Sequence, residues 1–217
     1  MPLGAVRYNC SMTFDWLSAA QRLRAMAQTG LTYCEGRFDR QRYEELREMS
    51  HAMLAELLEH PPASINEVFS IEQGYPTPKV DVRTAVFREG RVLLVKEWLD
   101  GAWTLPGGWA DEPDSPRQAA AREVLEESGY VVRVTRLVAV RDRRLHAYRP
   151  QHLGGIYKLI FLADLIGGEA RVSAETTEVG FFLPTELPPL SLSRTLPQDI
   201  QQALAHHLDP TLGSTCD

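Results

Sequence analysis

The sequence predicts a mixed α/β sandwich preceded by a small helical domain, and three observations lead to this division. The length of 217 residues suits one full domain plus a smaller accessory one. Apolar residues recur at helical spacing in the first third of the chain, whereas after about residue 78 they alternate with polar ones. The second part contains several strand-like segments and one strong helix near residues 116–128, which favours an α/β or α+β sandwich over a doubly wound fold. The expected boundaries are a tail over residues 1–13, a helical domain over 14–76 and a sandwich domain over 77–217.

The helical domain is expected to contain two helices and a short helical turn. A first helix over residues 14–29, with Gly30 as its stop, is indicated by apolar residues at steps of three or four: Trp16, Ala20, Leu23 and Ala27. Asp39 caps a second helix over residues 40–59, whose apolar stripe consists of Tyr43, Leu46, Met49, Met53 and Leu57. A helical turn over residues 64–71 follows, and residues 74–78 form the linker. Because two helices bury little alone, their stripes must pack on each other, on the next domain or on a second copy of the chain, and the last option predicts a homodimer.

The sandwich domain is predicted to begin with a β-hairpin. Apolar and polar residues alternate over residues 80–86, Glu89 and Gly90 turn the chain, and residues 91–96 return as a second strand. Further strands are expected over residues 131–144, 156–165 and 178–183. A last helix over residues 197–208 is announced by Thr195 and Pro197.

The helix over residues 116–128 has complete signals at both ends. Ser115 is a good N-cap, Pro116 suits the first helical position, and Gln118 completes a capping box with the serine. Gly129 fits the left-handed exit of a helix. Local chemistry therefore fixes both ends of this helix.

Three carboxylates, on Glu123, Glu126 and Glu127, fall on one arc of this helix, and the apolar arc opposite holds Ala121, Val124 and Leu125. A solvated acidic face is one interpretation. Negative charge in the last turns of a helix is disfavoured by the helix dipole and by repulsion at i,i+4, however, so the cluster calls for a counter-ion. Mg²⁺ or Mn²⁺ would satisfy it, because such ions prefer carboxylate oxygens and bridge to substrate phosphates. Arg122 can hold one of the glutamates by a charge-assisted hydrogen bond.

The segment from Gly108 to Tyr130 resembles the signature of the Nudix hydrolases, G-x5-E-x7-R-E-U-x-E-E-x-G-U, where U is apolar. It contains Arg122-Glu123-Val124-Leu125-Glu126-Glu127-Ser128-Gly129 at the required spacing. Asp114 stands where the family has glutamate, and this shorter carboxylate is expected to weaken one contact to the motif arginine. The resemblance implies an α/β/α sandwich with a mixed sheet.

The resemblance also implies hydrolysis of a nucleoside diphosphate linked to a moiety X, with Mg²⁺ or Mn²⁺ as cofactor. The metal ligands would be Glu123, Glu126, Glu127 and the carbonyl of Gly108, with Arg122 orienting the carboxylates. A general base must deprotonate the attacking water. That base is either a glutamate of the motif, Glu126 or Glu127, or one from a later loop, Glu175 or Glu178. Ordinary loop carboxylates are the alternative interpretation of the last two.

Substrate recognition is expected from residues outside the signature. Arg83 on the first strand and the pair Arg143 and Arg144 on a later loop are the candidates for contacts to the substrate, against the alternative of solvated surface charge. The helical domain and the catalytic segment together resemble a Nudix subgroup that includes bacterial CDP-choline pyrophosphatases, whose members are dimeric. The resemblance thus implies cleavage of CDP-choline to CMP and phosphocholine. ADP-ribose or nucleotide-sugar hydrolysis is the alternative, and a nucleotide-sensing module without catalysis is the alternative of another class.

Composition narrows the class of partner. The net charge of −6 argues against a broad basic surface for nucleic acid, although a small phosphate ester held through a cation remains compatible with it. The three cysteines lack zinc spacing and are expected to be free thiols in a reducing cytoplasm. No apolar run approaches the length of a membrane span, and the first residues lack the pattern of a secretory signal, so a cytoplasmic protein is expected.

Overall fold

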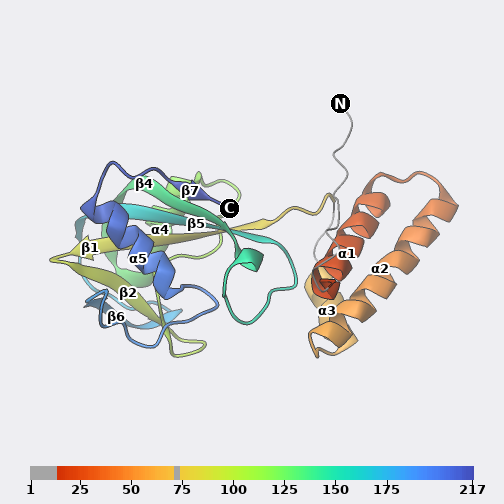
Figure 1. The fold of residues 1–217 in the computed structure, drawn as a ribbon, viewed down its shortest axis with the longest axis horizontal. Helices are drawn as coiled ribbons and strands as arrows, with labels where there is room; N and C mark the ends of the chain where they lie inside the picture. The colour runs from red at the N-terminus through yellow and green to blue at the C-terminus, as the bar shows by residue number, and fades with distance from the viewer. Residues whose placement is uncertain (1–13, 71–73) are drawn as a thin grey trace. The chain divides into compact units, whose positions relative to one another are not determined.

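The computed structural model describes residues 14–70 and 74–217, which fall into two compact units that meet between Thr77 and Pro78 (Figure 1). The tail expected over residues 1–13, and residue 71 at the end of the expected helical turn, lie outside the described residues. Among the helices of the described part, none is both long and apolar enough to cross a membrane. Each unit is described by itself below.

The first unit is a helical hairpin followed by a short helix. Its elements are α1 (Trp16–Tyr33), α2 (Arg37–Leu57) and α3 (Pro62–Ser70). The expectation that Gly30 ends the first helix is wrong, because α1 continues to Tyr33. A Cβ at position 30 would overlap the ring of Tyr43 on α2, so this glycine permits close packing of the two helices.

The expected cap of the second helix also needs correction. The helix begins at Arg37, and Gly36 occupies the N-cap position without a side-chain hydrogen bond. Asp39 lies in the first turn instead, where its carboxylate accepts a hydrogen bond from Arg42 at 2.8 Å. An acidic residue there is favourable because the N-terminus of a helix carries positive partial charge.

The second unit is built on a mixed sheet, as the sequence predicted. The strands are β1 (Lys79–Arg88), β2 (Arg91–Glu97), β3 (Trp103–Thr104), β4 (Tyr130–Asp142), β5 (Ile156–Gly168), β6 (Thr176–Phe182) and β7 (Thr215–Cys216). Strand β1 pairs antiparallel with β2 through the expected hairpin and parallel with β5. Strand β4 is antiparallel to β5, and β6 is antiparallel to β2. The two-residue strands β3 and β7 were not expected, because they are too short to show a period.

Two helices cover opposite faces of this sheet (Figure 1). Helix α4 (Pro116–Ser128) packs on one face and α5 (Pro197–Leu208) on the other. Alternate residues of β1 serve the two layers: Val82 and Val86 pack with α4, whereas Ala85 and Phe87 pack with α5. The predicted α/β/α sandwich is therefore confirmed.

The starts of the two helices have different origins. The predicted capping box of α4 is present: the Ser115 hydroxyl accepts from the Gln118 amide and the Gln118 side chain accepts from the Ser115 amide. Helix α5 spans the predicted residues, but Thr195 lies before its N-cap residue, Leu196, and contacts the turn before α4 instead. Its hydroxyl accepts a hydrogen bond from the Leu105 amide at 3.1 Å, and Asp199 accepts from the Leu196 amide at 2.7 Å at the helix start.

The turn before α4 runs along β1 and is held there by its backbone. The Val82 amide donates to the Gly108 carbonyl at 2.8 Å, and the Thr84 amide donates to the Pro106 carbonyl at 2.9 Å. Gly107 has a φ of +147°, and a Cβ there would overlap the Val82 carbonyl oxygen. Only glycine allows the two backbones to approach so closely.

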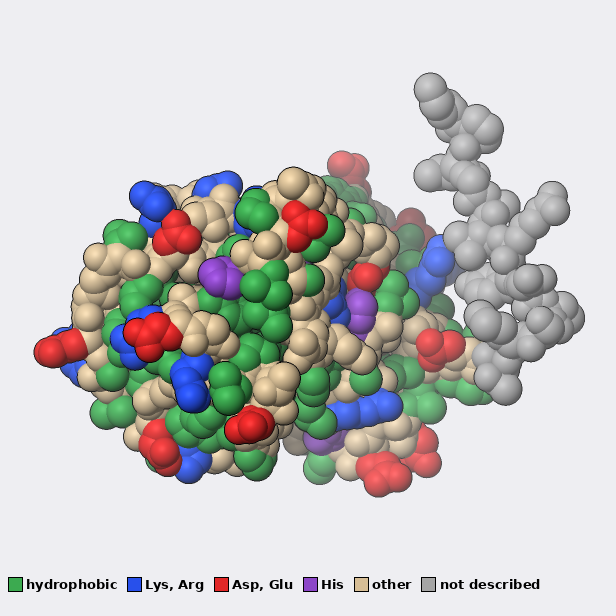
Figure 2. All heavy atoms as spheres, turned by 60° about the vertical axis from the view of Figure 1, so that its left-hand side comes forward, with side chains coloured by type: hydrophobic (Ala, Val, Ile, Leu, Met, Phe, Trp, Pro, Cys, Tyr) green, Lys and Arg blue, Asp and Glu red, His purple; other side chains and the backbone are tan. Residues whose placement is uncertain are grey.

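The surface of this unit carries mixed charge on the face seen in Figure 2. Lysine and arginine side chains are interspersed there with aspartate and glutamate and form no broad basic patch. This face therefore lacks the continuous positive surface that a nucleic-acid backbone requires.

We predict that Gly107→Ala lowers the free energy of unfolding by roughly 3 kcal/mol or more, because the added methyl group displaces β1 or the turn. Urea denaturation of the full chain measures this. The matched control is Gly90→Ala, where the residue has a φ of +72° but no atom lies within 4 Å of the added carbon. That variant should lose only about 1–2 kcal/mol, and equal losses in both variants would contradict the close-approach argument.

Candidate active site

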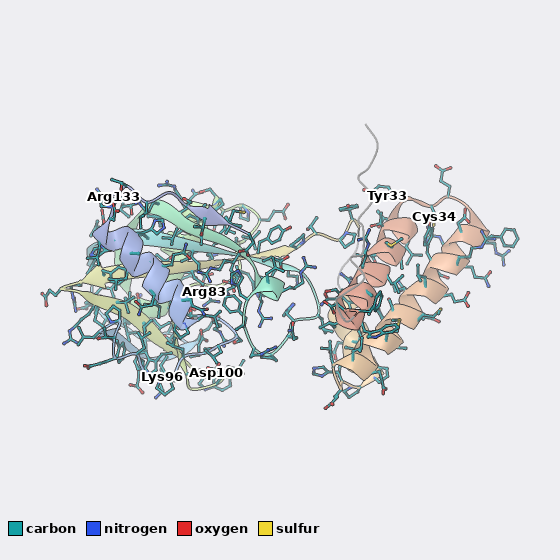
Figure 3. The ribbon with its side chains drawn as sticks, in the orientation of Figure 1. Tyr33, Cys34, Arg83, Lys96, Asp100 and Arg133 are labelled. Atoms are coloured by element: carbon teal, nitrogen blue, oxygen red, sulfur yellow. The ribbon has the colours of Figure 1, made fainter. Side chains whose placement is uncertain are left out.

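A cavity of about 470 Å³ opens beside the turn before α4, next to Arg83 in the middle of β1 and Glu97 at the end of β2. It is lined by Arg83, Glu97, Gly107, Gly108, Trp109, Asp111, Arg122, Glu123, Glu126, Glu127, Ser173, Ala174, Glu175 and Arg194. Figure 3 labels Arg83 within this unit, and Lys96 and Asp100 near the end of β2. The cavity thus joins the predicted carboxylate cluster to residues from five other segments of the chain.

The spacing of residues predicted that the carboxylates of α4 lie on the face opposite its apolar side chains. This prediction is wrong. Glu123 and Glu127 are buried on the same side of the helix as Val124, whereas Leu125 is 42% exposed. Glu126 lies at the edge, with 56% of its side chain exposed. The buried face of α4 therefore contains two glutamate side chains, which lie beside the Gly107–Gly108 turn.

Arg122 binds the carboxylates of the signature together. It donates to Asp114 at 2.8 Å and to Glu123 and Glu126 at 3.0 Å, and it lies 3.3 Å from Asp111. The shorter side chain of Asp114 still reaches the arginine, so the expected weakening of this contact is not seen. The hydrogen bond that Arg122 donates to Asp114, together with the charge of the neighbouring glutamates, raises the pKa of the guanidinium above its ordinary value.

Glu127 is the most deeply buried carboxylate of the helix. It is 4% exposed, and one of its oxygens accepts a hydrogen bond from the Gly107 amide at 2.8 Å. Burial raises the pKa of Glu127 to about 8, although nearby Arg83 acts in the opposite direction. Burial likewise raises the pKa of Glu123 above its ordinary value. Burial therefore disfavours the ionised form of both carboxylates, and a bound cation would offset this penalty.

The donor set fits a hard divalent cation. Carboxylates from Glu123, Glu126 and Glu127 reach one cavity, and a Cβ at Gly108 would come within 3.0 Å of the Glu123 carboxylate, so the glycine leaves room beside it. The Gly108 carbonyl already accepts from the Val82 amide, which leaves it a second lone pair. Within residues 14–70 and 74–217, no three His, Cys, Asp or Glu side chains are yet arranged as a metal cage. The reason is that Arg122 holds Glu123 and Glu126, while the Gly107 amide holds Glu127.

Arg83 reaches the cavity wall from β1, but its guanidinium is occupied by the protein. Its Nε and Nη2 donate to Asp81 at 2.8 and 3.3 Å, and its Nη1 donates to the Leu105 carbonyl at 3.3 Å. Asp81 is held in turn by the buried ammonium of Lys158 at 2.8 Å. Arg83 thus contributes a fixed positive charge to the wall beside Glu127.

Three other predicted site residues are not brought to this cavity. Arg143 donates to the Pro150 carbonyl at 2.7 Å, and Arg144 donates to the Asp142 carboxylate at 3.0 Å. Glu178 lies on β6 and is bound by Lys96 at 2.7 Å. Glu175, the other loop carboxylate considered, does line the cavity.

Sequence reasoning missed Glu97 and Arg194, which both line the cavity. Glu97 ends β2, is 7% exposed and lies 3.1 Å from Nε of Arg194. Burial raises the pKa of Glu97, while the charge of Arg194 lowers it. Neither residue belongs to a spaced motif, so the sequence offered no signal that they meet.

Comparison with known proteins identifies both units. Residues 14–69 match the family model described as "UDP-X-like, N-terminal oligomerisation domain", and residues 77–204 match the NUDIX domain. Among curated proteins, the chain is 42% identical over 185 residues to YjhB of Bacillus subtilis, which is provisionally assigned as an ADP-ribose pyrophosphatase. That match covers 85% of this chain and 88% of YjhB.

Solved structures give the same result. A crystal structure of a UDP-X diphosphatase superposes with a TM-score of 0.60 at 30% identity, covering 94% of this chain and 98% of that one. An ADP-ribose pyrophosphatase from Streptococcus suis superposes with a TM-score of 0.57 at 34% identity, covering 65% of this chain and all of the other. Both units thus have relatives of known structure.

We predict that Glu127→Gln stabilises the metal-free protein at high pH. Because the pKa of Glu127 is raised from 4.5 to about 8, the folded state keeps a proton that the unfolded chain releases, and stability falls as pH rises through this window. The variant should therefore exceed the wild type by about 1 kcal/mol or more, roughly 2–4 °C in Tm, at pH 8.5, and by less at pH 5. Thermal melts in EDTA measure the difference. Glu126→Gln, at an exposed position, is the control, and an equal gain at both pH values for Glu127→Gln would contradict the burial argument.

Proposed function

The chain belongs to the Nudix family of pyrophosphatases, and we propose that it hydrolyses ADP-ribose or a nucleotide sugar to a nucleoside monophosphate and a phosphorylated moiety X. One observation carries the proposal: the three glutamates of the signature, of which Glu123 and Glu127 are buried, share one cavity with the Gly107–Gly108 turn. Such an acidic cavity is unsuited to a free phosphate ester but suits one that enters with a divalent cation.

The choice of substrate differs from the one that the subgroup resemblance predicted. That resemblance placed CDP-choline first, with ADP-ribose and nucleotide sugars as the alternative. The relatives named above are called ADP-ribose pyrophosphatases and a UDP-X diphosphatase, which supports the alternative. We therefore place ADP-ribose and UDP-linked sugars ahead of CDP-choline.

Each residue of the cavity has a proposed task in this reaction. Glu123, Glu126, Glu127 and the Gly108 carbonyl would hold Mg²⁺ or Mn²⁺, and Arg122 would keep the carboxylates in register. When bound, the cation offsets charge on the pyrophosphate oxygens and lowers the pKa of a water. The carboxylate that deprotonates the attacking water is a motif glutamate or Glu175, which lines the cavity, in preference to Glu178, which is paired with Lys96.

The bond change follows from these positions. Water attacks one phosphorus of the diphosphate, the bridging P–O bond breaks, and the base takes the proton of the water. The bridging oxygen leaves with the other phosphate. Because water is the nucleophile, no group on the protein becomes covalently modified. The Arg83 guanidinium, fixed by Asp81, adds positive potential at the wall where negative charge increases.

The helical unit is proposed to form a homodimer. Several large apolar side chains of α1 and α2 are exposed, among them Trp16 at 59%, Tyr33 at 67% and Phe38 at 75%. A cavity of about 750 Å³ lies beside them, lined in part by Met26, Tyr33 and Tyr43. Tyr33 and Cys34 mark the end of α1 in Figure 3. An unpaired surface of this kind in a domain that matches an oligomerisation family supports self-association.

We predict turnover of at least one substrate in a panel of ADP-ribose, UDP-sugars, CDP-choline, NADH and diadenosine polyphosphates with Mg²⁺ or Mn²⁺. Release of phosphomonoester products measures the rate. Glu126→Gln should lower kcat at least about a hundredfold, because one ligand of the cation is lost, while the Tm stays nearly unchanged. Glu186→Gln, an exposed loop substitution far along the chain, is the charge-matched control and should keep full activity. Absence of turnover on the whole panel would refute the proposed function.

We predict a dimer mass at micromolar concentration in light scattering. Replacing Tyr33 and Phe38 by serine should shift the mass to that of a monomer, because both apolar side chains are exposed within the helical unit. A wild-type monomer at that concentration would contradict the dimer.

A further inference from the structure

Arg194 is a cationic residue of the cavity that lies outside the signature and has no assigned role. It is located in the loop between β6 and α5 and reaches the cavity that contains the carboxylates of α4. We propose that Arg194 is a substrate-binding residue that donates hydrogen bonds to a phosphate oxygen of the diphosphate. The inference rests on the proposed function, since it assumes a diphosphate substrate in this cavity.

The loop that carries Arg194 is fixed to the sheet on both sides of the residue. The Ser191 amide donates to the Trp103 carbonyl at 2.8 Å, and the Trp103 amide donates to the Pro189 carbonyl at 2.9 Å. On the other side, the Thr195 hydroxyl lies 2.8 Å from the Thr104 hydroxyl. Strand β3 leads directly into the turn that contains Gly107, so the arginine is attached to the same rigid element as that turn.

The side chain of Arg194 is held through Nη1 and Nε, and its Nη2 is left without a partner in the described part of the chain. Its Nη1 donates to Asp100 at 3.1 Å and to the Ser191 hydroxyl at 3.0 Å, and its Nε lies 3.1 Å from Glu97. Asp100 is fixed in turn by a 2.7 Å hydrogen bond from the Ser191 hydroxyl. Among the described residues, no atom accepts a hydrogen bond from Nη2, and 22% of the side chain is exposed. The guanidinium is therefore oriented in advance, with two N–H donors left over.

In the other two cavity arginines, each guanidinium nitrogen either donates to a protein group or is buried. All three guanidinium nitrogens of Arg83 are bound to Asp81 and the Leu105 carbonyl. Nε and Nη1 of Arg122 donate to Asp114, Glu123 and Glu126, whereas its Nη2 lies 3.3 Å from Asp111 and makes no hydrogen bond to a described residue. The unbonded Nη2 of Arg122 is buried beside Asp111, whereas the side chain of Arg194 is 22% exposed where it lines the cavity. Within the described chain, Arg194 is thus the cavity arginine with donors that a ligand can reach.

The chemistry of a guanidinium suits a phosphate in particular. Its planar donors match the oxygens of phosphate and carboxylate, and a charge-assisted hydrogen bond is stronger than a neutral one. Burial raises the pKa of Glu97, the carboxylate beside Nε, while the charge of Arg194 acts in the opposite direction. A phosphate oxygen at Nη2 would supply the hydrogen-bond acceptor that this nitrogen lacks among the described residues.

The test compares Arg194→Ala with the wild-type chain on the substrate that the panel identifies. We expect KM to rise about ten- to a hundredfold with kcat within about threefold, as loss of a charge-assisted contact predicts. Arg194→Lys should recover part of the loss, and the concentration of Mg²⁺ for half-maximal rate should stay unchanged. The matched control is Arg133→Ala, an exposed arginine on β4 that pairs with Asp164 and is labelled in Figure 3. It should leave KM and kcat unchanged.

Two outcomes would overturn the inference. An unchanged KM in Arg194→Ala means that the substrate does not touch this residue. A joint fall of Tm and kcat, with no rise in KM and no rescue by Arg194→Lys, means that Arg194 only ties its loop to Asp100. Calorimetric binding of inorganic pyrophosphate with Mg²⁺ separates this inference from the proposed function. An inactive wild type refutes the function, whereas equal pyrophosphate affinity in the wild type and Arg194→Ala refutes the role of Arg194.

Discussion

The close approach of the Gly107–Gly108 turn to strand β1 is the constraint on which the rest of the site depends. Three backbone hydrogen bonds hold the turn along the strand, and the φ of +147° at Gly107 excludes any side chain there. The same approach presents the Gly107 amide to Glu127 at 2.8 Å and leaves space for the Glu123 carboxylate beside Gly108. A turn without these glycines would stand away from the sheet, and the acids of α4 would face water.

Burial of those acids places stability and function in opposition. A carboxylate with a pKa of about 8 in the metal-free protein is charged only at a cost in folding free energy. The protein offsets part of that cost with arginines on both sides, Arg122 within the signature and Arg83 from β1. A divalent cation placed among these carboxylates would be stabilised by the negative charge that the arginines now offset. Burial of these carboxylates would therefore favour the binding of a divalent cation, as proposed for this site.

How much of the molecule could be predicted from sequence depends on the range of the signal. The capping box of α4 and the hairpin after Lys79 rest on neighbouring residues, and both are present as predicted. The role of Gly30 was misjudged because its reason lies on another helix, at Tyr43. The spacing of the three glutamates identified the reaction, yet a helical wheel does not tell which arc is buried. Glu97 and Arg194 meet only through the tertiary fold, so no local pattern could have revealed them.

The arginines of the cavity suggest why the signature predicts a reaction better than it predicts a substrate. Arg122 belongs to the signature and donates hydrogen bonds to Asp114, Glu123 and Glu126, so it holds the acids of the signature in place. The other side chains that line the cavity, which include Glu97 and Arg194, come from the end of β2 and the loop before α5. The signature does not constrain these segments. A family with this division can keep its chemistry fixed while the loops vary. The proposed phosphate contact of Arg194 fits this division, because its loop is attached to β3 and not to α4, the helix that carries the signature.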